Sequence, residues 1–290
     1  MKEKTFERSS EGNWDLEIKP KPHLLDLNFA EIWRYKDLML LFVKRDFIAQ
    51  YKQTILGPVW HLIQPILTTL MFLLIFSNIA KIPTDGINPV VFYMSGITVW
   101  NYFSLCLTST SNTFLTNANI FGKVYFPRLI MPLSVIISNM IRFGIQFLLL
   151  LSMMIWFHFH GFPMQITFKW LTIPILILLM AGIALGLGIV ISSLTTKYRD
   201  FSVLLAFAIQ LGMYATPIAY PMTYLEGTSY GSIIKLNPLT AVVEAFRYVL
   251  FGKGLFNPMD LLYSAGFMIV LLFIGIILFN RVEKKFMDTV

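Results

Sequence analysis

The chain has 290 residues, of which 56% are hydrophobic and only 13% are charged. Because soluble domains carry about 25% charged residues, this composition and a mean hydropathy of +0.67 exclude a soluble domain and predict an all-α integral membrane protein. The net charge of +7 and the single Cys106 predict basic cytoplasmic loops, no nucleic-acid partner and no intramolecular disulfide.

The N-terminal region predicts a tail followed by one helix. Residues 1–26 are polar and predict a flexible cytoplasmic tail without a cleavable signal sequence. The region 27–56 predicts an amphipathic helix, because four apolar side chains recur on one face: Ile32, Tyr35, Met39 and Phe42. Its longest apolar run, residues 38–43, is too short to cross about 30 Å of hydrocarbon. We therefore expect this helix to lie in the cytoplasmic interface, with an ordinary soluble helix as the alternative.

Six segments within a transmembrane domain of residues 57–280 are long and apolar enough to cross a bilayer. They cover residues 59–79, 90–111, 129–157, 170–194, 203–221 and 259–280. An even number of spans places both termini on one side. That side carries 17 Lys and Arg residues and the other side carries 5, so the positive-inside rule predicts that both termini, including the tail 281–290, are cytoplasmic.

A shorter apolar segment, residues 238–251, lies between the fifth and sixth spans. Asn237 can cap a helix that has Pro238 at its first position, and Gly252 is expected to end it. We expect a re-entrant helical hairpin on the outer face that covers a pathway, since irregular backbone at membrane depth survives only against protein or water. The alternative is a helix lying flat on the outer face of the membrane.

The sequence pattern contains no recognisable catalytic site. No span interior contains Asp or Glu, which ion-coupled carriers usually need, and there is no phosphate-binding loop motif. No His cluster has metal-ligand spacing. We therefore expect a transport subunit rather than an enzyme, with no metal or cofactor bound by this chain and with its energy supplied by another polypeptide.

Two patterns inside the spans predict helix contacts. Arg142 is the only ionisable side chain well inside a span, and it belongs to a polar stripe with a four-residue repeat: Ser134, Ser138, Arg142 and Gln146. One interpretation is that the stripe lines a translocation path or forms a dimer contact. The other, which we favour, is that the Arg142 side chain extends to the cytoplasmic interface. In the fourth span, small residues four apart predict close helix packing: Gly182 and Gly186, and Ala184 and Gly188.

Aromatic residues make up 15% of the chain, and most are expected at the membrane interfaces. Four lie deeper: Trp100, Tyr102, Phe103 and Tyr214. Aromatic faces can stack on the apolar faces of sugar rings, so these residues are candidates for the lining of a glycan path. Packing in the protein core is the alternative.

Four segments between residue 27 and the C-terminus carry a family resemblance. They are 51–60 (YKQTILGPVW) with Gln64-Pro65, 117–128 (NANIFGKVYFPR) with Pro132, 198–201 (YRDF), and 214–218 (YATPI) with Tyr220-Pro221 and 237–239 (NPL). Taken in order, they resemble the permeases of type-2 ABC exporters. The resemblance is strongest to the branch that exports lipid-linked polysaccharides such as O-antigen and teichoic acid.

The resemblance implies a homodimer that carries two copies of a separate ATP-binding subunit, where ATP and Mg²⁺ would bind. It implies coupling to that subunit through Arg45, Phe121, Lys123, Tyr125, Phe126 and Arg128. It implies a substrate path beside spans one and five, with the candidates Trp60, Gln64, Trp100, Tyr102, Phe103 and Tyr214. It also implies an outer gate at Tyr220, Asn237, Pro238, Glu244 and Arg247.

The function implied by the resemblance is export of an undecaprenyl-linked, O-antigen-like polysaccharide across the inner membrane, driven by ATP hydrolysis on the separate subunit. Teichoic acid and capsule remain alternative substrates. A permease for drugs or another small amphiphile is a second interpretation, against which the entry sequence 56–60 (LGPVW) counts. A membrane transferase would need acidic or histidine residues clustered at one membrane face, and a purely structural subunit leaves the outer hairpin unexplained.

Overall fold

The computed structural model describes residues 29–52, 57–121, 126–162, 167–198 and 200–286, which form a bundle of helices. In chain order the elements are α1 (Phe29–Arg34), α2 (Lys36–Tyr51), η1 (Gly57–Val59), α3 (Trp60–Phe72), η2 (Leu73–Ile79), α4 (Pro89–Ser111), α5 (Thr113–Phe121), α6 (Ile130–Phe159), η3 (Phe168–Thr172), α7 (Ile173–Thr195), α8 (Phe201–Tyr214), η4 (Met222–Leu225), α9 (Ser229–Lys235), α10 (Pro238–Phe251) and α11 (Pro258–Phe286). The element η2 is a π-helix that continues α3.

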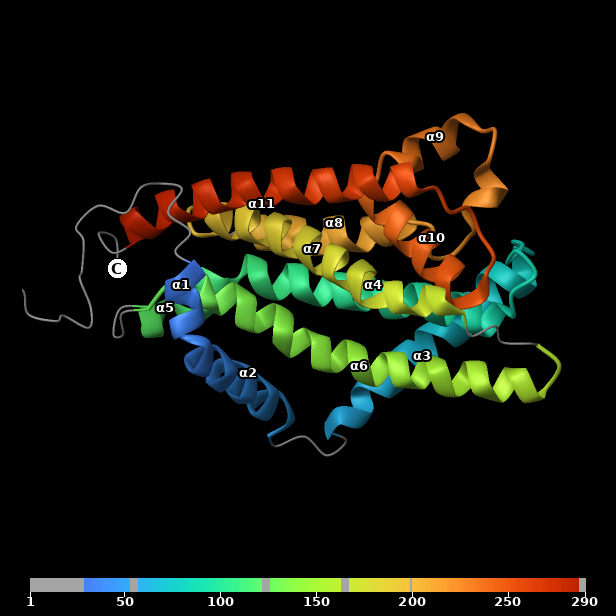
Figure 1. The fold of residues 1–290 in the computed structure, drawn as a ribbon, viewed down its shortest axis with the longest axis horizontal. Helices are drawn as coiled ribbons and strands as arrows, with labels where there is room; N and C mark the ends of the chain where they lie inside the picture. The colour runs from blue at the N-terminus through green and yellow to red at the C-terminus, as the bar shows by residue number, and fades with distance from the viewer. Residues whose placement is uncertain (1–28, 53–56, 122–125, 163–166, 199, 287–290) are drawn as a thin grey trace, which may run out of the picture.

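The long helices α4, α6, α7 and α11 run along the length of the molecule (Figure 1). Helix α4 is central, because it packs against α3, α6 and α7 and buries most of its side chains. Helices α1, α2 and α5 lie at one end together with the C-terminal part of α11, whereas α9 and α10 lie at the opposite end. The first and last described helices therefore end on the same side of the bundle.

Five helical segments are long and apolar enough to cross a membrane, among the described residues: Trp60–Ile79, Pro89–Ser111, Ile130–Phe159, Phe168–Thr195 and Pro258–Arg281. They coincide with five of the six predicted spans. The predicted fifth span, residues 203–221, is not confirmed, since α8 has 14 residues and is only about 21 Å long at 1.5 Å per residue. The helix ends at Tyr214 because Pro217 follows, and a proline disfavours helical backbone at the residue before it.

Helix α7 packs closely on two neighbours through its small residues. A Cβ on Gly186 would lie 3.1 Å from the backbone carbon of Leu271 on α11, and one on Gly188 would lie 2.6 Å from Cβ of Thr110 on α4. A larger side chain at either position would push the helices apart. The prediction that these glycines serve close helix packing is confirmed.

The helix predicted over residues 238–251 is present as α10 and has both predicted ends. The Asn237 Oδ1 atom accepts a hydrogen bond from the Leu239 N–H at 3.0 Å, which satisfies a free donor of the first turn. Gly252 follows the helix with a φ of 68°, a backbone conformation that glycine adopts without steric cost. The re-entrant position of α10 in a membrane stays a prediction.

The predicted apolar face of the N-terminal helix packs against the bundle, although Tyr35 divides the helix into α1 and α2. Phe42 is buried, and three residues of the same face pack beside it: Ile32, Tyr35 and Met39. The opposite side exposes three large apolar side chains: Leu40, Leu41 and Ile48. An apolar face with a uniformly polar back is therefore not confirmed, and the interfacial position of α2 stays a prediction.

Candidate functional site

Arg247 is the centre of a buried polar contact between α10 and the segment that follows α8. Its side chain is 1% exposed. The guanidinium donates hydrogen bonds to the carbonyl oxygens of Pro217 and Ile218, the latter at 2.8 Å. It lies 3.8 Å from the centroid of the Phe92 ring and forms an ion pair with Glu244 at 3.3 Å. One arginine on α10 therefore fixes the backbone after α8.

The Arg247 guanidinium has room against α4 because the α4 residue next to it is a glycine, Gly96. A Cβ on Gly96 would lie 2.7 Å from Nη2 of Arg247, so any larger residue would displace the guanidinium. Glu244 is only 3% exposed. A buried carboxylate that lacks a cationic partner is strongly destabilising, so Glu244 and Arg247 depend on each other.

Two other predicted gate residues hold the same segment. The side-chain amide of Asn237 donates to the carbonyl oxygen of Ala215 at 3.1 Å and to Oγ1 of Thr216 at 2.9 Å. The Tyr220 hydroxyl donates to the carbonyl oxygen of Tyr214 at 2.8 Å. We name as the carbonyl clamp these four side chains and the backbone that they hold: Tyr220, Asn237, Glu244, Arg247 and residues 214–218.

The clamp brings together four of the five predicted gate residues at the end of the bundle that carries α9 and α10 (Figure 1). The fifth, Pro238, begins α10, and its carbonyl oxygen accepts a hydrogen bond from the Ser264 hydroxyl of α11 at 2.7 Å. Helix α10 is thus tied both to the end of α8 and to the start of α11. A gating role for these residues stays a prediction.

A cluster of aromatic rings joins α2, α5, α6 and α11 at the opposite end of the bundle. The Phe126 ring centroid lies 5.6 Å from that of Phe42 and 5.8 Å from that of Phe121. The Phe114 and Phe279 rings pack at a tilt with a centroid distance of 4.7 Å. All five rings are buried. We name as the aromatic cluster these rings and their apolar neighbours: Phe42, Phe114, Phe121, Phe126, Ile130, Met131, Ile189 and Phe279.

Two predicted coupling arginines lie against this cluster. The guanidinium of Arg128 lies 5.6 Å from the centroid of the Phe121 ring, and that of Arg45 lies 4.9 Å from the Phe42 ring. Arg45 also pairs with Asp46 at 2.7 Å. Two predicted coupling residues fall outside the described ranges: Lys123 and Tyr125. The other four gather at one place, and their coupling role stays a prediction.

The predicted path residues separate into two groups. Three are exposed on the chain: Trp60, Gln64 and Tyr214. Three are buried in the core: Trp100, Tyr102 and Phe103. The Trp100 ring on α4 packs directly against α8, since a Cβ on Gly212 of α8 would lie 3.1 Å from that ring. The path role of all six residues stays a prediction.

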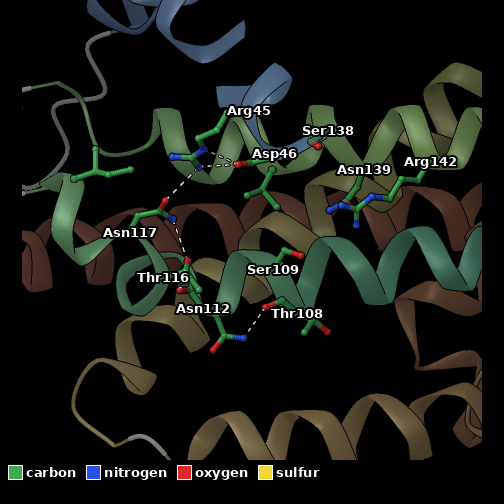
Figure 2. Close-up of a pocket in the computed structure, with 12 residues that line it drawn as sticks. Arg45, Asp46, Thr108, Ser109, Asn112, Thr116, Asn117, Ser138, Asn139 and Arg142 are labelled. Carbon is green, nitrogen blue, oxygen red and sulfur yellow. Dashed lines mark hydrogen bonds and ion pairs between the residues drawn. The ribbon is translucent and has the colours of Figure 1, made fainter. Parts of the chain in front are cut away.

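Figure 2 shows a polar cavity between α2, α4, α5 and α6, which the sequence patterns do not predict as a site. Its volume is about 540 Å³. It is lined by Arg45, Asp46, Thr108, Ser109, Asn112, Thr116, Asn117, Ile120, Val135, Ser138, Asn139 and Arg142. The run 108–113 (TSTSNT) is the sequence signal that could have indicated it, because six consecutive hydroxyl and amide side chains supply hydrogen-bonding groups at the end of a span.

Arg142 faces this cavity and the neighbouring helix α2. The guanidinium interacts electrostatically with the phenol of Tyr51 on α2. Burial raises the pKa of Tyr51 above its ordinary value of 10.0, and the positive charge of Arg142 opposes that rise. The other members of the polar stripe are buried in the chain: Ser134, Ser138 and Gln146. The stripe thus faces protein rather than lipid.

Comparison with known proteins gives a consistent picture over most of the chain. Residues 37–251 match the family model described as ABC-2 type transporter. The chain is 29% identical over 255 residues to the O-antigen export system permease protein RfbA of Klebsiella pneumoniae, covering 87% of this chain and 94% of that protein. It is 23% identical over 262 residues to RfbA of Myxococcus xanthus, covering 90% and 98%. It is 24% identical over 252 residues to the polysialic acid transport protein KpsM of Escherichia coli, covering 84% and 93%.

Proposed function

Because the chain belongs to the ABC-2 type transporter family, we propose that it is the membrane permease subunit of an ABC exporter for lipid-linked polysaccharide. The observation that carries the proposal is the similarity to O-antigen export permeases over most of the length of both chains. The polysaccharide is O-antigen-like and undecaprenyl-linked, and it crosses the inner membrane. This chain contributes the path, and a separate subunit contributes ATP hydrolysis with ATP and Mg²⁺.

The proposed orientation places both termini and the aromatic cluster on the cytoplasmic side, and the carbonyl clamp on the outer side. The excess of Lys and Arg toward the termini supports it, as does the gathering of α1 and the end of α11 at one end of the bundle (Figure 1). The fifth crossing is made by α8 together with the turns and bends of residues 215–221, and α10 re-enters the membrane beside it. Burial of that segment's carbonyl groups against Arg247 supports this arrangement.

The aromatic cluster is the proposed receiver of motion from the ATP-binding subunit. Phe121 and Phe126 lie in or next to the short segment between α5 and α6, and Phe42 connects them to α2. A displacement of this segment by the ATP-binding subunit would displace α6 and α11 as well, because Ile130 of α6 and Phe279 of α11 pack in the same cluster. The chain therefore needs no catalytic site of its own to be driven.

The proposed substrate path lies between two copies of this chain. Trp60 and Tyr214 expose about half of their surface, at 53% each, and they belong to α3 and α8, which correspond to spans one and five. Large exposed aromatic rings suit stacking against sugars, whereas a single chain leaves them without a partner surface. A homodimer that encloses these two helices satisfies both requirements.

The test is export in a host that lacks its own O-antigen permease. We would express the chain with and without a candidate ATP-binding subunit from the same organism, and detect surface polysaccharide by immunoblot. The expected result is surface polysaccharide only when both subunits are present. Copurification without polysaccharide export, together with increased resistance to a small amphiphile, would favour the drug-permease alternative.

A further inference from the structure

The polar cavity of Figure 2 is a built site that the proposed substrate path does not use. Helices α2, α4, α5 and α6 each contribute polar side chains to it. Its volume of about 540 Å³ is within the range of small-molecule sites. The site is not part of the proposed path, which runs along α3 and α8.

The charge of the lining favours an anion. The described lining residues include two guanidinium groups, Arg45 and Arg142, and one carboxylate, Asp46. Asp46 forms an ion pair with Arg45 at 2.7 Å, and its charge also acts on Arg142, which has no ion pair of its own among the described residues. The lining therefore carries one excess positive charge, presented by a group that matches phosphate oxygens well.

Neutral donors surround that charge. Ser138 lies one helical turn before Arg142 on α6, is 4% exposed, and its hydroxyl has no hydrogen-bond partner among the described residues. A buried hydroxyl without a partner is costly. On the opposite wall, the Asn112 amide donates one of its two hydrogens to the carbonyl oxygen of Thr108 and keeps the other. The Asn117 amide is already engaged by two hydrogen bonds within α5. Hydroxyl and amide donors next to an arginine can share the oxygens of one phosphate group.

The outside of the same turns of α6 is apolar. Ile137 and Ile141, which directly precede Ser138 and Arg142, are 36% and 40% exposed. On α2, Leu41 and Ile48 are also exposed. A molecule with a phosphate in the cavity would therefore have its remaining parts beside a surface suited to acyl chains. Basic pockets between membrane helices on the cytoplasmic side are known to take anionic lipid headgroups.

We propose that this cavity binds the phosphate group of an anionic phospholipid from the cytoplasmic leaflet. The inference rests on the orientation given under the proposed function. A phosphodiester carries one negative charge and matches the single excess positive charge of the lining, whereas a polyprenyl diphosphate or free phosphate would bring more. The bound lipid fastens α2 to α6 beside the aromatic cluster.

The test uses the full chain purified with its ATP-binding subunit, delipidated and placed in phosphatidylcholine nanodiscs. Phosphatidylglycerol is added, and bound lipid is counted by native mass spectrometry while the thermal midpoint is recorded. Arg142→Gln should bind phosphatidylglycerol about ten-fold more weakly, the value for loss of one charge-assisted hydrogen bond. Ser138→Ala, which keeps the charge and the volume nearly unchanged, should weaken it about five-fold.

Lys44→Gln is the matched control, because it removes an exposed positive charge from α2 outside the cavity. It should leave phosphatidylglycerol binding unchanged. The proposal is overturned if Lys44→Gln loses as much binding as Arg142→Gln, if neither cavity variant loses any, or if inorganic phosphate or polyprenyl diphosphate displaces phosphatidylglycerol at equal concentration. No polysaccharide is needed in this assay, so failure of lipid binding and failure of export are separate results.

Discussion

The two ends of the bundle are held by different kinds of contact. In the aromatic cluster, rings such as Phe42 and Phe126 pack at centroid distances near 5.6 Å with tilted planes, and no bond fixes a single geometry. In the carbonyl clamp, Arg247 is fixed by two backbone oxygens and a buried carboxylate. Aromatic pairs pack favourably over centroid distances of about 4.5–7 Å, whereas loss of one partner from a buried ion pair is strongly destabilising. The first suits the transmission of motion, and the second suits a gate with two states.

Arg247→Ala is expected to have the largest effect, because it leaves Glu244 buried without a cation. We expect the free energy of unfolding of the purified complex to fall by about 3–5 kcal/mol, measured by SDS or thermal denaturation. The control Lys235→Ala removes an exposed cation from α9 and should change stability by less than about 0.5 kcal/mol. Equal stability of the two variants would show that the clamp does not hold this end.

Gly186→Leu tests the close contact between α7 and α11, which run between the two ends of the bundle. The new side chain would meet the backbone of α11 at about the 3.1 Å given for Leu271, and overpacking of this kind costs about 1–3 kcal/mol. Gly144→Leu on α6 is the matched control, because a Cβ there meets nothing within 4 Å. If both variants unfold alike, the contact between α7 and α11 does not depend on the glycine.

Asn237→Ala, compared with a second helix-cap variant, separates the helix-capping contribution of Asn237 from its hydrogen bonds to the segment after α8. Asn237 caps α10 and also donates to Ala215 and Thr216, whereas Asn88 caps α4 through the Val90 N–H. Loss of a cap costs about 1 kcal/mol, and we expect Asn237→Ala to cost about 1 kcal/mol more than Asn88→Ala because two further bonds are lost. The same denaturation assay measures the difference, and equal costs would remove Asn237 from the clamp.

Phe121→Leu is expected to have the smallest effect. Leucine keeps an apolar side chain in the aromatic cluster, so the free energy of unfolding should fall by about 1–2 kcal/mol, well below the roughly 3–5 kcal/mol of a Phe→Ala change. The corresponding conservative change at the other end, Arg247→Lys, should cost more, since lysine cannot reach two carbonyl groups in the planar geometry of a guanidinium. A larger loss of unfolding free energy for Phe121→Leu than for Arg247→Lys would contradict the conclusion that the carbonyl clamp depends on one fixed geometry more than the aromatic cluster does.

Local signals in the sequence predict α10 to the residue. Asn237, Pro238 and Gly252 are start and stop residues with direct backbone consequences, so the helix needs no tertiary information to be found. The predicted fifth span extended to residue 221 because residues 215–221 contain no charged side chain, so their mean hydropathy resembles that of a span. Pro217 is a local signal that the helix ends earlier, but a mean hydropathy over many residues does not register a single proline.

Contacts between distant residues could not be predicted in the same way. The sequence places Arg247 on the outer side, but the carbonyl groups that it binds lie 30 and 29 residues earlier. The direction in which Arg142 points depends on α2, which is remote in sequence. Periodicity identifies the face of a helix, but the partner of that face follows only from how the helices pack.

The most direct test of the account is ATP hydrolysis by the reconstituted complex, measured with and without lipid-linked polysaccharide. If motion is transmitted through the aromatic cluster, polysaccharide will change the rate for the natural chain and for Phe159→Ala, whose ring is 80% exposed at the far end of α6. Phe126→Ala should still bind the ATP-binding subunit but lose this response, and Phe126→Leu should keep most of it. An unchanged response in Phe126→Ala would contradict coupling through the aromatic cluster, and no stable complex with any ATP-binding subunit would contradict the exporter assignment itself.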